Sequence, residues 1–149
     1  MKTIVLTFSK KFPSHHTRKG EATNFIDKLL TKTKTTTIRG NEKRWRKIRR
    51  EVNEGRAFLS LRYWSDKPYR SKQVEFARVY EMATHRVFIT NSHNGFEMSI
   101  NGVCSDNCAI NHIVKREGFD TAADFTDWFT AKEFSGVMIE LFEIEKIIK

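Results

Sequence analysis

The most informative stretch of the sequence is Lys34-Thr35-Thr36-Thr37-Ile38-Arg39, which closes a threonine-rich run that opens at Thr31. Its β-branched residues favour an extended strand, in which alternate side chains point to opposite faces. Thr35, Thr37 and Arg39 are therefore expected on one face, and the long Lys34 side chain can fold over it. A hydroxyl, an ammonium and a guanidinium together suit a phosphate, a carbonyl or a nucleobase edge. The same residues also fit an edge strand with solvated cations, and both interpretations stay open.

The sequence on either side of this strand predicts a mixture of strands and helices. We expect a strand at 3–8, a loop at 12–20, an amphipathic helix at 21–31 and a second helix at 42–54. Further strands are expected at 56–64, 73–82, 85–90, 96–100 and 137–144, with a turn near Thr84 and helices at 106–117 and 121–131. This order is too irregular for a parallel βαβ array. It favours an α+β protein built on a closed or half-closed mixed β-barrel that helices decorate.

The spacing Lys34-x-x-Thr37-x-Arg39 after an amphipathic helix resembles the signature of the ASCH domain family. The fuller family pattern is Gly-x-Lys-x-x-Thr-x-Arg, and this chain has Lys32 in the place of the glycine. The resemblance implies a small PUA-like β-barrel associated with RNA, and it could cover most of residues 1–149.

One branch of that family consists of small bacterial amidohydrolases that remove the acetyl group from N4-acetylcytidine, which makes catalysis a second possibility. Lys34 and Thr37 match the lysine and threonine of those enzymes, and Glu117 is the candidate for their glutamate. The chemistry requires the Thr37 hydroxyl as nucleophile, Lys34 as base and Glu117 as proton shuttle or orienting group. A lysine acts as a base near neutral pH only if burial or neighbouring cations lower its pKa, and Arg39 is such a neighbour. Glu117-Gly118 also fits the exposed end of a helix.

Charge is distributed unevenly along the chain, whose net charge is +9. Residues 1–80 hold 21 Lys and Arg against 7 Asp and Glu, whereas residues 81–149 hold 6 against 11. The basic half is a candidate surface for a polyanion, although a merely solvated surface has the same composition.

Two groups of residues could bind RNA. The first lies on the expected helix at 42–54 and would contact phosphates, or it forms a solvated face. The second combines cations with aromatic rings, which suits base stacking, although Trp64 and Tyr69 also fit a core and a barrel edge. The candidate binding residues, besides Lys34, Thr37 and Arg39, are Lys43, Arg44, Arg46, Lys47, Arg62, Trp64, Lys67, Tyr69, Arg70 and Lys72. RNA is favoured over duplex DNA because no helix-turn-helix or zinc pattern is visible.

Cysteine and histidine offer no clear metal site, and we expect neither a metal nor a cofactor. Cys104, Cys108 and His112 follow at helical i, i+4 steps, but a zinc site needs a fourth ligand and none is marked. Buried reduced thiols beside a core histidine are the preferred interpretation. The adjacent His15 and His16 are expected on the surface.

Length and hydropathy favour one domain over residues 1–149, with no membrane-spanning segment or signal peptide. A cytoplasmic location follows as the default. The leading expectation is therefore an RNA- or nucleotide-binding module with a basic cleft. The alternatives are an amidohydrolase that acts on a modified nucleoside and a protein-interaction module whose basic half binds an acidic partner.

Overall fold

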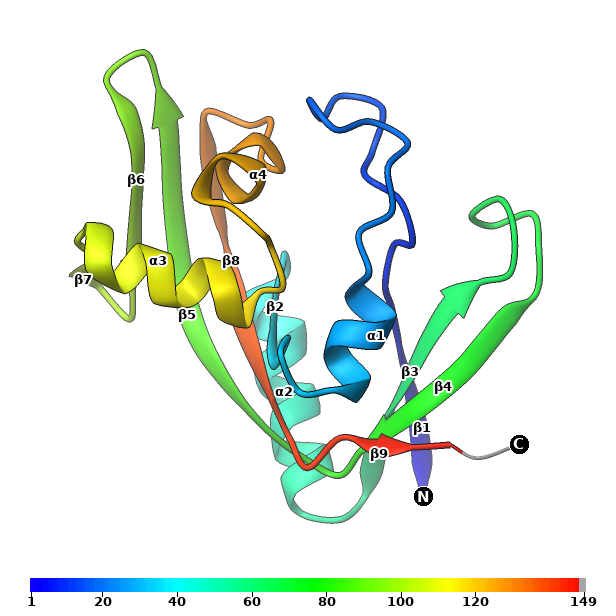
Figure 1. Ribbon diagram of the computed structural model, residues 1–149. Coiled ribbons are helices and arrows are strands. Elements are labelled where there is room, and N and C mark those ends of the chain that lie inside the picture. The colour runs from blue at the N-terminus through cyan, green and yellow to red at the C-terminus, as the bar shows by residue number, and fades with distance from the viewer. Residues whose placement is uncertain (148–149) are drawn as a thin grey trace.

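The computed structural model describes residues 1–147 (Figure 1). Four helices and nine strands follow one another in this part of the chain. In chain order they are β1 (Lys2–Thr7), α1 (Phe25–Leu30), β2 (Thr36–Arg39), α2 (Glu42–Asn53), β3 (Ala57–Trp64), β4 (Gln73–Val79), β5 (Glu81–Ser92), β6 (Gly95–Ile100), β7 (Val103–Cys104), α3 (Asn107–Arg116), α4 (Ala122–Asp127), β8 (Glu133–Phe142) and β9 (Glu145–Lys146).

These strands form two sheets, so the expected α+β class is confirmed, and of the two expected forms of barrel the closed one is not present in the described residues. One sheet has the order β1-β3-β4-β9 and the other the order β2-β8-β5-β6-β7. The two sheets diverge from the end where β9 lies, and α1 with the segment before it lies between them (Figure 1). Within the described residues no ladder joins the free edge of β1 to the free edge of β2, and that opening is what leaves room for a cleft.

Strand β8 is central because each of its faces meets a different hydrophobic core. Val137, Ile139 and Leu141 pack in a core with β1, β3 and α2, whereas Met138 packs on the opposite face with α3 and α4. This alternation is what the period of two in a strand predicts. The sheet is therefore a shared wall, and its edge strand β2 lies where the two cores meet.

Helix α2 lies against one face of this wall. Its seam of Trp45, Ile48 and Val52 is buried, as its sequence pattern predicts. The amide of Asn53 at its end accepts from the Met82 N–H at 3.0 Å and donates to the Met82 carbonyl at 2.8 Å. These two bonds fix the helix lengthwise against β5.

Two boundaries differ from the expectation. The turn between β4 and β5 lies at Tyr80, not near Thr84, because Thr84 is in the middle of a strand and pairs with Ile139. Helix α1 begins at Phe25 because Asn24 is left-handed, with φ 60°, and Ala22 forms a β-bridge with Lys11. In the part of the chain that the structure describes, no helix is long and apolar enough to cross a bilayer.

Candidate functional site

A pocket of about 790 Å³ lies between the two sheets, and it brings the four principal predicted residues together. Lys34, Thr37, Arg39 and Glu117 all line it, although they come from opposite parts of the chain. Aromatic rings form much of the remaining wall, contributed by Phe8, Phe12, Phe25, Phe119, Trp128 and Phe129. The pocket therefore combines an apolar wall with a small set of polar groups, as small-molecule sites usually do.

The Glu117 carboxylate fastens the edge strand β2 to the end of α3. One carboxylate oxygen accepts from the Thr36 hydroxyl, and the other accepts from the Ile38 N–H at 3.1 Å. Glu117 is 3% exposed, so the interpretation of an exposed helix end is wrong. A carboxylate held by two donors has a defined position from which to accept a further hydrogen bond.

Lys34 is buried beside this carboxylate, with 2% of its surface exposed. Its Nζ donates to the Thr36 carbonyl at 2.8 Å and to the Glu117 carbonyl, and it lies 4.6 Å from the centroid of the Phe25 ring. Burial lowers the pKa of Lys34 to about 8; the Glu117 charge opposes this effect, and Arg39 and Lys28 lower the value further. A substantial share of the amine is therefore neutral slightly above neutral pH.

Gly118 makes room for this lysine. Its φ of +89° is left-handed, and a Cβ there would lie 2.9 Å from the Lys34 Cδ and 3.1 Å from the Lys34 Cβ. Only glycine meets both requirements without strain. Gly118 is a position that the sequence pattern marked merely as the end of a helix.

Arg39 is oriented by fixed acceptors. Its Nε donates to the Thr37 Oγ1 at 3.1 Å, its Nη2 donates to the Thr7 carbonyl at 2.6 Å, and its guanidinium lies over the Phe8 ring. Burial lowers the pKa of Arg39 to about 10, against the opposing charge of Glu117, so it stays protonated at neutral pH. The remaining guanidinium hydrogens are available to a ligand in the pocket.

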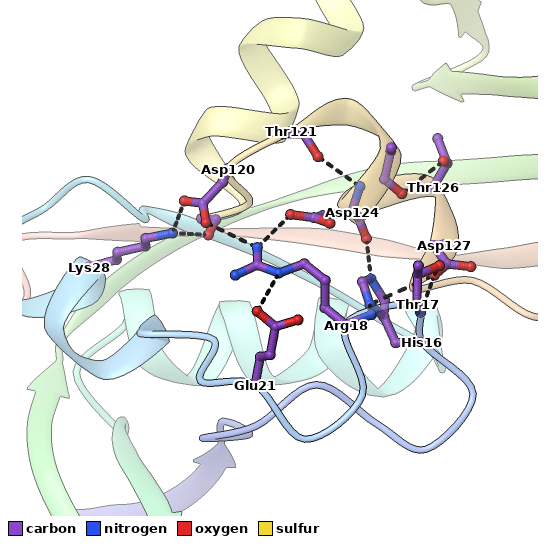
Figure 2. A network of polar contacts seen from close by, with 12 residues as sticks. His16, Thr17, Arg18, Glu21, Lys28, Asp120, Thr121, Asp124, Thr126 and Asp127 are labelled. Atoms are coloured by element: carbon purple, nitrogen blue, oxygen red, sulfur yellow. Dashed lines mark hydrogen bonds and ion pairs between the residues drawn. The ribbon is translucent and has the colours of Figure 1, made fainter.

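The loop before α1 supplies another part of the wall, and a network of polar contacts holds it on α4 (Figure 2). Arg18 donates to Asp124 at 2.7 Å and to Asp120 at 3.1 Å. The ring of His16 accepts from the Arg18 N–H through Nδ1 and contacts the Asp124 carbonyl through Nε2 at 2.8 Å. His16 is 3% exposed, so the expectation that both histidines lie on the surface is wrong for His16.

At the mouth of the pocket, the second predicted group is only partly assembled. Trp64, Lys67 and Tyr69 line the pocket, and the rings of Trp64 and Tyr69 lie 5.1 Å apart. Arg62, Arg70 and Lys72 are not among its lining residues. Lys10 and Lys11 do line it, and sequence reasoning missed them because they follow an ordinary strand with no motif of their own.

The basic helix does not contribute to this pocket. Lys43, Arg44, Arg46 and Lys47 are exposed and lie on α2, outside the lining. The expectation that these cations hold phosphates stays a prediction, and the buried seam of α2 places them outside the cleft of the threonine strand. Any binding by these cations would use a separate surface.

The two cysteines are exposed, so the expectation of buried thiols is wrong. Asp106 caps α3 between the two cysteines, so Cys108 lies in the helix whereas Cys104 lies outside it, in β7. His112 on α3 is also exposed. Among residues 1–147, no cluster of three side chains is arranged to hold a metal ion.

Comparison with known proteins finds no matching family model, no matching curated protein and no matching solved structure. The resemblance to the ASCH family therefore stays a prediction that depends on the residues of the pocket.

Proposed function

We propose that this protein is a PUA-like module of the ASCH type that binds a nucleotide, either free or within single-stranded RNA, in the pocket between the sheets. The observation that carries the proposal is the convergence of Lys34, Thr37, Arg39 and Glu117 on one aromatic-lined pocket. These are the residues on which the resemblance depends.

The chemistry of the pocket suits a nucleobase. Every base has an apolar face that stacks on aromatic rings, and a polar edge that needs both donors and acceptors. The wall supplies the rings, Arg39 and the Thr37 hydroxyl supply donors, and Glu117 supplies an acceptor. Lys10, Lys11 and Lys67 at the mouth are placed to meet the phosphates of a base that has entered.

The backbone before Lys34 also supports the family resemblance. Lys32 occupies the place of the family glycine and has a φ of 64°, in the left-handed region where glycine is favoured. Lys32→Gly should therefore raise the free energy of unfolding by roughly 0.5 kcal/mol. Glycine relieves the backbone strain of the folded state, and this gain exceeds the cost of the conformational entropy that glycine adds to the unfolded chain. If urea unfolding shows that Lys32→Gly lowers the free energy of unfolding by about 1 kcal/mol or more, this alignment of the motif is contradicted.

The binding experiment measures the affinity of a short single-stranded RNA and of nucleoside monophosphates from the quenching of tryptophan fluorescence. Thr37→Val removes the hydroxyl at nearly constant volume and Arg39→Gln removes the guanidinium; each should weaken binding at least fivefold. Arg50→Gln on α2, outside the pocket, is the matched control and should leave monophosphate binding unchanged. Saturable binding that neither pocket variant weakens would disprove the proposal.

The same experiment addresses the third candidate, a module that binds an acidic protein partner. A poly-glutamate peptide carries charge but has no bases to stack. If it displaces a nucleoside monophosphate from the pocket at equal charge concentration, the pocket is not a nucleotide site.

A second candidate function is hydrolysis of an acylated amine on a nucleoside, such as N4-acetylcytidine, and the lowered pKa of Lys34 favours it. In this reaction the Thr37 Oγ attacks the acyl carbonyl while its proton passes to the neutral Lys34 amine. The intermediate collapses, the nucleoside amine leaves with that proton, and water then hydrolyses the acyl-threonine ester. Arg39 is positioned to stabilise the negative charge on the carbonyl oxygen.

Hydrolysis ranks below binding because the proposed catalytic groups are already engaged. The Lys34 amine donates to two carbonyls and both Glu117 oxygens accept hydrogen bonds, so proton transfer has to disturb these contacts. The test uses chromatography to measure the release of cytidine from N4-acetylcytidine. Thr37→Ala and Lys34→Ala are the controls that should be inactive. Absence of turnover by the wild type would end this hypothesis and leave the binding proposal in place.

A further inference from the structure

A second, smaller pocket of about 310 Å³ lies between α2 and β5, on the face of the sheet that α2 covers. Three arginines from two different elements line it, with one glutamate. Its lining consists of Glu42, Arg46, Arg49, Thr84, Arg86, Asn101 and Val137.

The helix side of this pocket is a regular stripe. Glu42, Arg46, Arg49 and Asn53 follow at steps of three and four residues, which places them on one face of α2. Asn53 is fixed to Met82 of β5 by its two hydrogen bonds, and one turn earlier Arg49 donates from Nη1 to the Thr84 Oγ1 at 3.3 Å. Arg46 lies one further turn along α2 from Arg49, and Arg86 lies two residues along β5 from Thr84, so Arg46 lies opposite Arg86.

The strand side is equally well defined. Thr84 and Arg86 are two residues apart on β5 and therefore share the face that meets α2. The Arg86 N–H donates to the Asn101 Oδ1 at 2.9 Å, and its Nη2 lies 3.4 Å from the position that a Cβ would take on Gly102. The turn at 101–102 is thus bound to the backbone of Arg86, and Gly102 lies close to this guanidinium.

Charge in this pocket is unbalanced. Arg46 has a weak ion pair with Glu42, at 3.8 Å, whereas Arg49 and Arg86 form no ion pair with any residue in 1–147. Three guanidinium groups around one carboxylate repel one another, and a bound anion would relieve that repulsion. Guanidinium forks match the oxygens of a phosphate better than any other side chain does.

We propose that this pocket is a phosphate-binding site. Its volume is at the lower end for ligand pockets, so it suits a phosphate group with a small substituent. Either a backbone phosphate of RNA or the phosphate of a small metabolite presents this chemistry. The site itself stands on its own geometry, and only its assignment to an RNA backbone rests on the proposed function.

The position of the site relative to the large pocket is set by the sheet. Arg39 pairs with Val137 on β2 and β8, and Val137 pairs with Arg86 on β5. Arg39 and Arg86 are therefore two strands apart in one row, about 10 Å from backbone to backbone. A single-stranded ligand can thus be tested for contact with both sites.

The experiment follows the arginine Nε–H signals by NMR while inorganic phosphate is added to the full chain. In the wild type we expect saturable shifts at Arg46, Arg49 and Arg86. Arg49→Gln and Arg86→Gln should each weaken phosphate binding at least fivefold, and Arg50→Gln, on the exposed face of the same helix, should not change it. Circular dichroism verifies that each variant is folded.

Equal, non-saturating shifts at all exposed arginines, Arg50 included, would overturn the proposal, as would binding that Arg86→Gln leaves intact. Thr37→Val should not alter the phosphate titration. If neither RNA nor nucleoside monophosphates bind in the large pocket while inorganic phosphate still binds saturably, the nucleotide proposal fails and the phosphate site stands. If RNA binds without shifting these three signals, the phosphate comes from a small molecule.

Discussion

The large pocket and helix α2 both present basic side chains, but in opposite environments. In the pocket, Lys34 is buried and Arg39 is tied to fixed acceptors. On α2, Lys43 and Lys47 are exposed. Buried cations with fixed partners have a defined position and a shifted pKa. Exposed cations attract an anionic ligand, but dissolved salt screens that attraction. Removing groups at the two places should therefore have unequal effects.

The largest loss is expected for Glu117→Ala. It leaves the Thr36 hydroxyl and the Ile38 N–H buried without an acceptor, which should lower the free energy of unfolding by about 3 kcal/mol or more. Urea unfolding followed by tryptophan fluorescence measures it. Glu117→Gln retains the volume and one acceptor oxygen and should lose less than half as much; equal losses would mean that a single acceptor is not enough and that both carboxylate oxygens are required.

The next effect depends on pH. Because the folded-state pKa of Lys34 is about 8 and its unfolded value is near 10.5, burial of the charge opposes folding below pH 8. The unfolded chain binds more protons between these values, so stability should rise with pH over that range, by up to roughly 3 kcal/mol in total. Lys34→Met has no such proton and should lack this rise. Parallel stability curves for the two proteins from about pH 7.5 to 10 would contradict the shift.

Two glycines give a matched pair of intermediate effect. Gly55 and Gly118 both have a left-handed φ, but only at Gly118 would a Cβ meet a neighbour, the stem of Lys34. Gly55→Ala should cost about 1 kcal/mol of unfolding free energy, and Gly118→Ala about 2–3 kcal/mol. If calorimetry gives the same loss for both, the Lys34 stem adapts and is not tightly packed.

The smallest stability effect is expected on α2. Lys43→Gln combined with Lys47→Gln should change the free energy of unfolding by less than about 0.5 kcal/mol, because both side chains are exposed. If these lysines neutralise RNA phosphates, the slope of log affinity against log salt should fall by about 0.7 for each phosphate left without its lysine. An unchanged slope would mean that Lys43 and Lys47 do not contact RNA phosphates and that the RNA binds at the large pocket alone.

Local pattern predicted much of this architecture. Alternation identified most strands, and the Trp45, Ile48 and Val52 seam identified the buried side of α2. The turn near Thr84 was misplaced because β5 and the strand before it have similar β-branched composition, and only pairing with β8 shows that β5 is continuous. The choice between a closed and a half-closed barrel stayed open, since closure depends on which edges meet, and sequence alone does not reveal that.

The site was predictable where a motif specified it and not elsewhere. Lys34, Thr37, Arg39 and Glu117 do meet in one pocket. The contacts of Thr36 with Glu117 and of His16 with α4 were missed, because they join segments about 80 and 108 residues apart. Charge along a chain likewise does not reveal the face on which it lies, so the sequence alone did not separate the cations of α2 from those of the pocket.

The Arg18 network has a consequence for how salt titrations of this protein are interpreted. Two of the acids around Arg18, Glu21 and Asp120, are more than half exposed, so dissolved ions weaken their hold on the loop that lines the pocket. The dependence of affinity on ionic strength will therefore contain two contributions, the weakening of the Arg18 ion pairs and the release of counterions from the phosphates of the ligand. An uncharged nucleoside releases no counterions of its own, so its salt slope isolates the share that belongs to the wall.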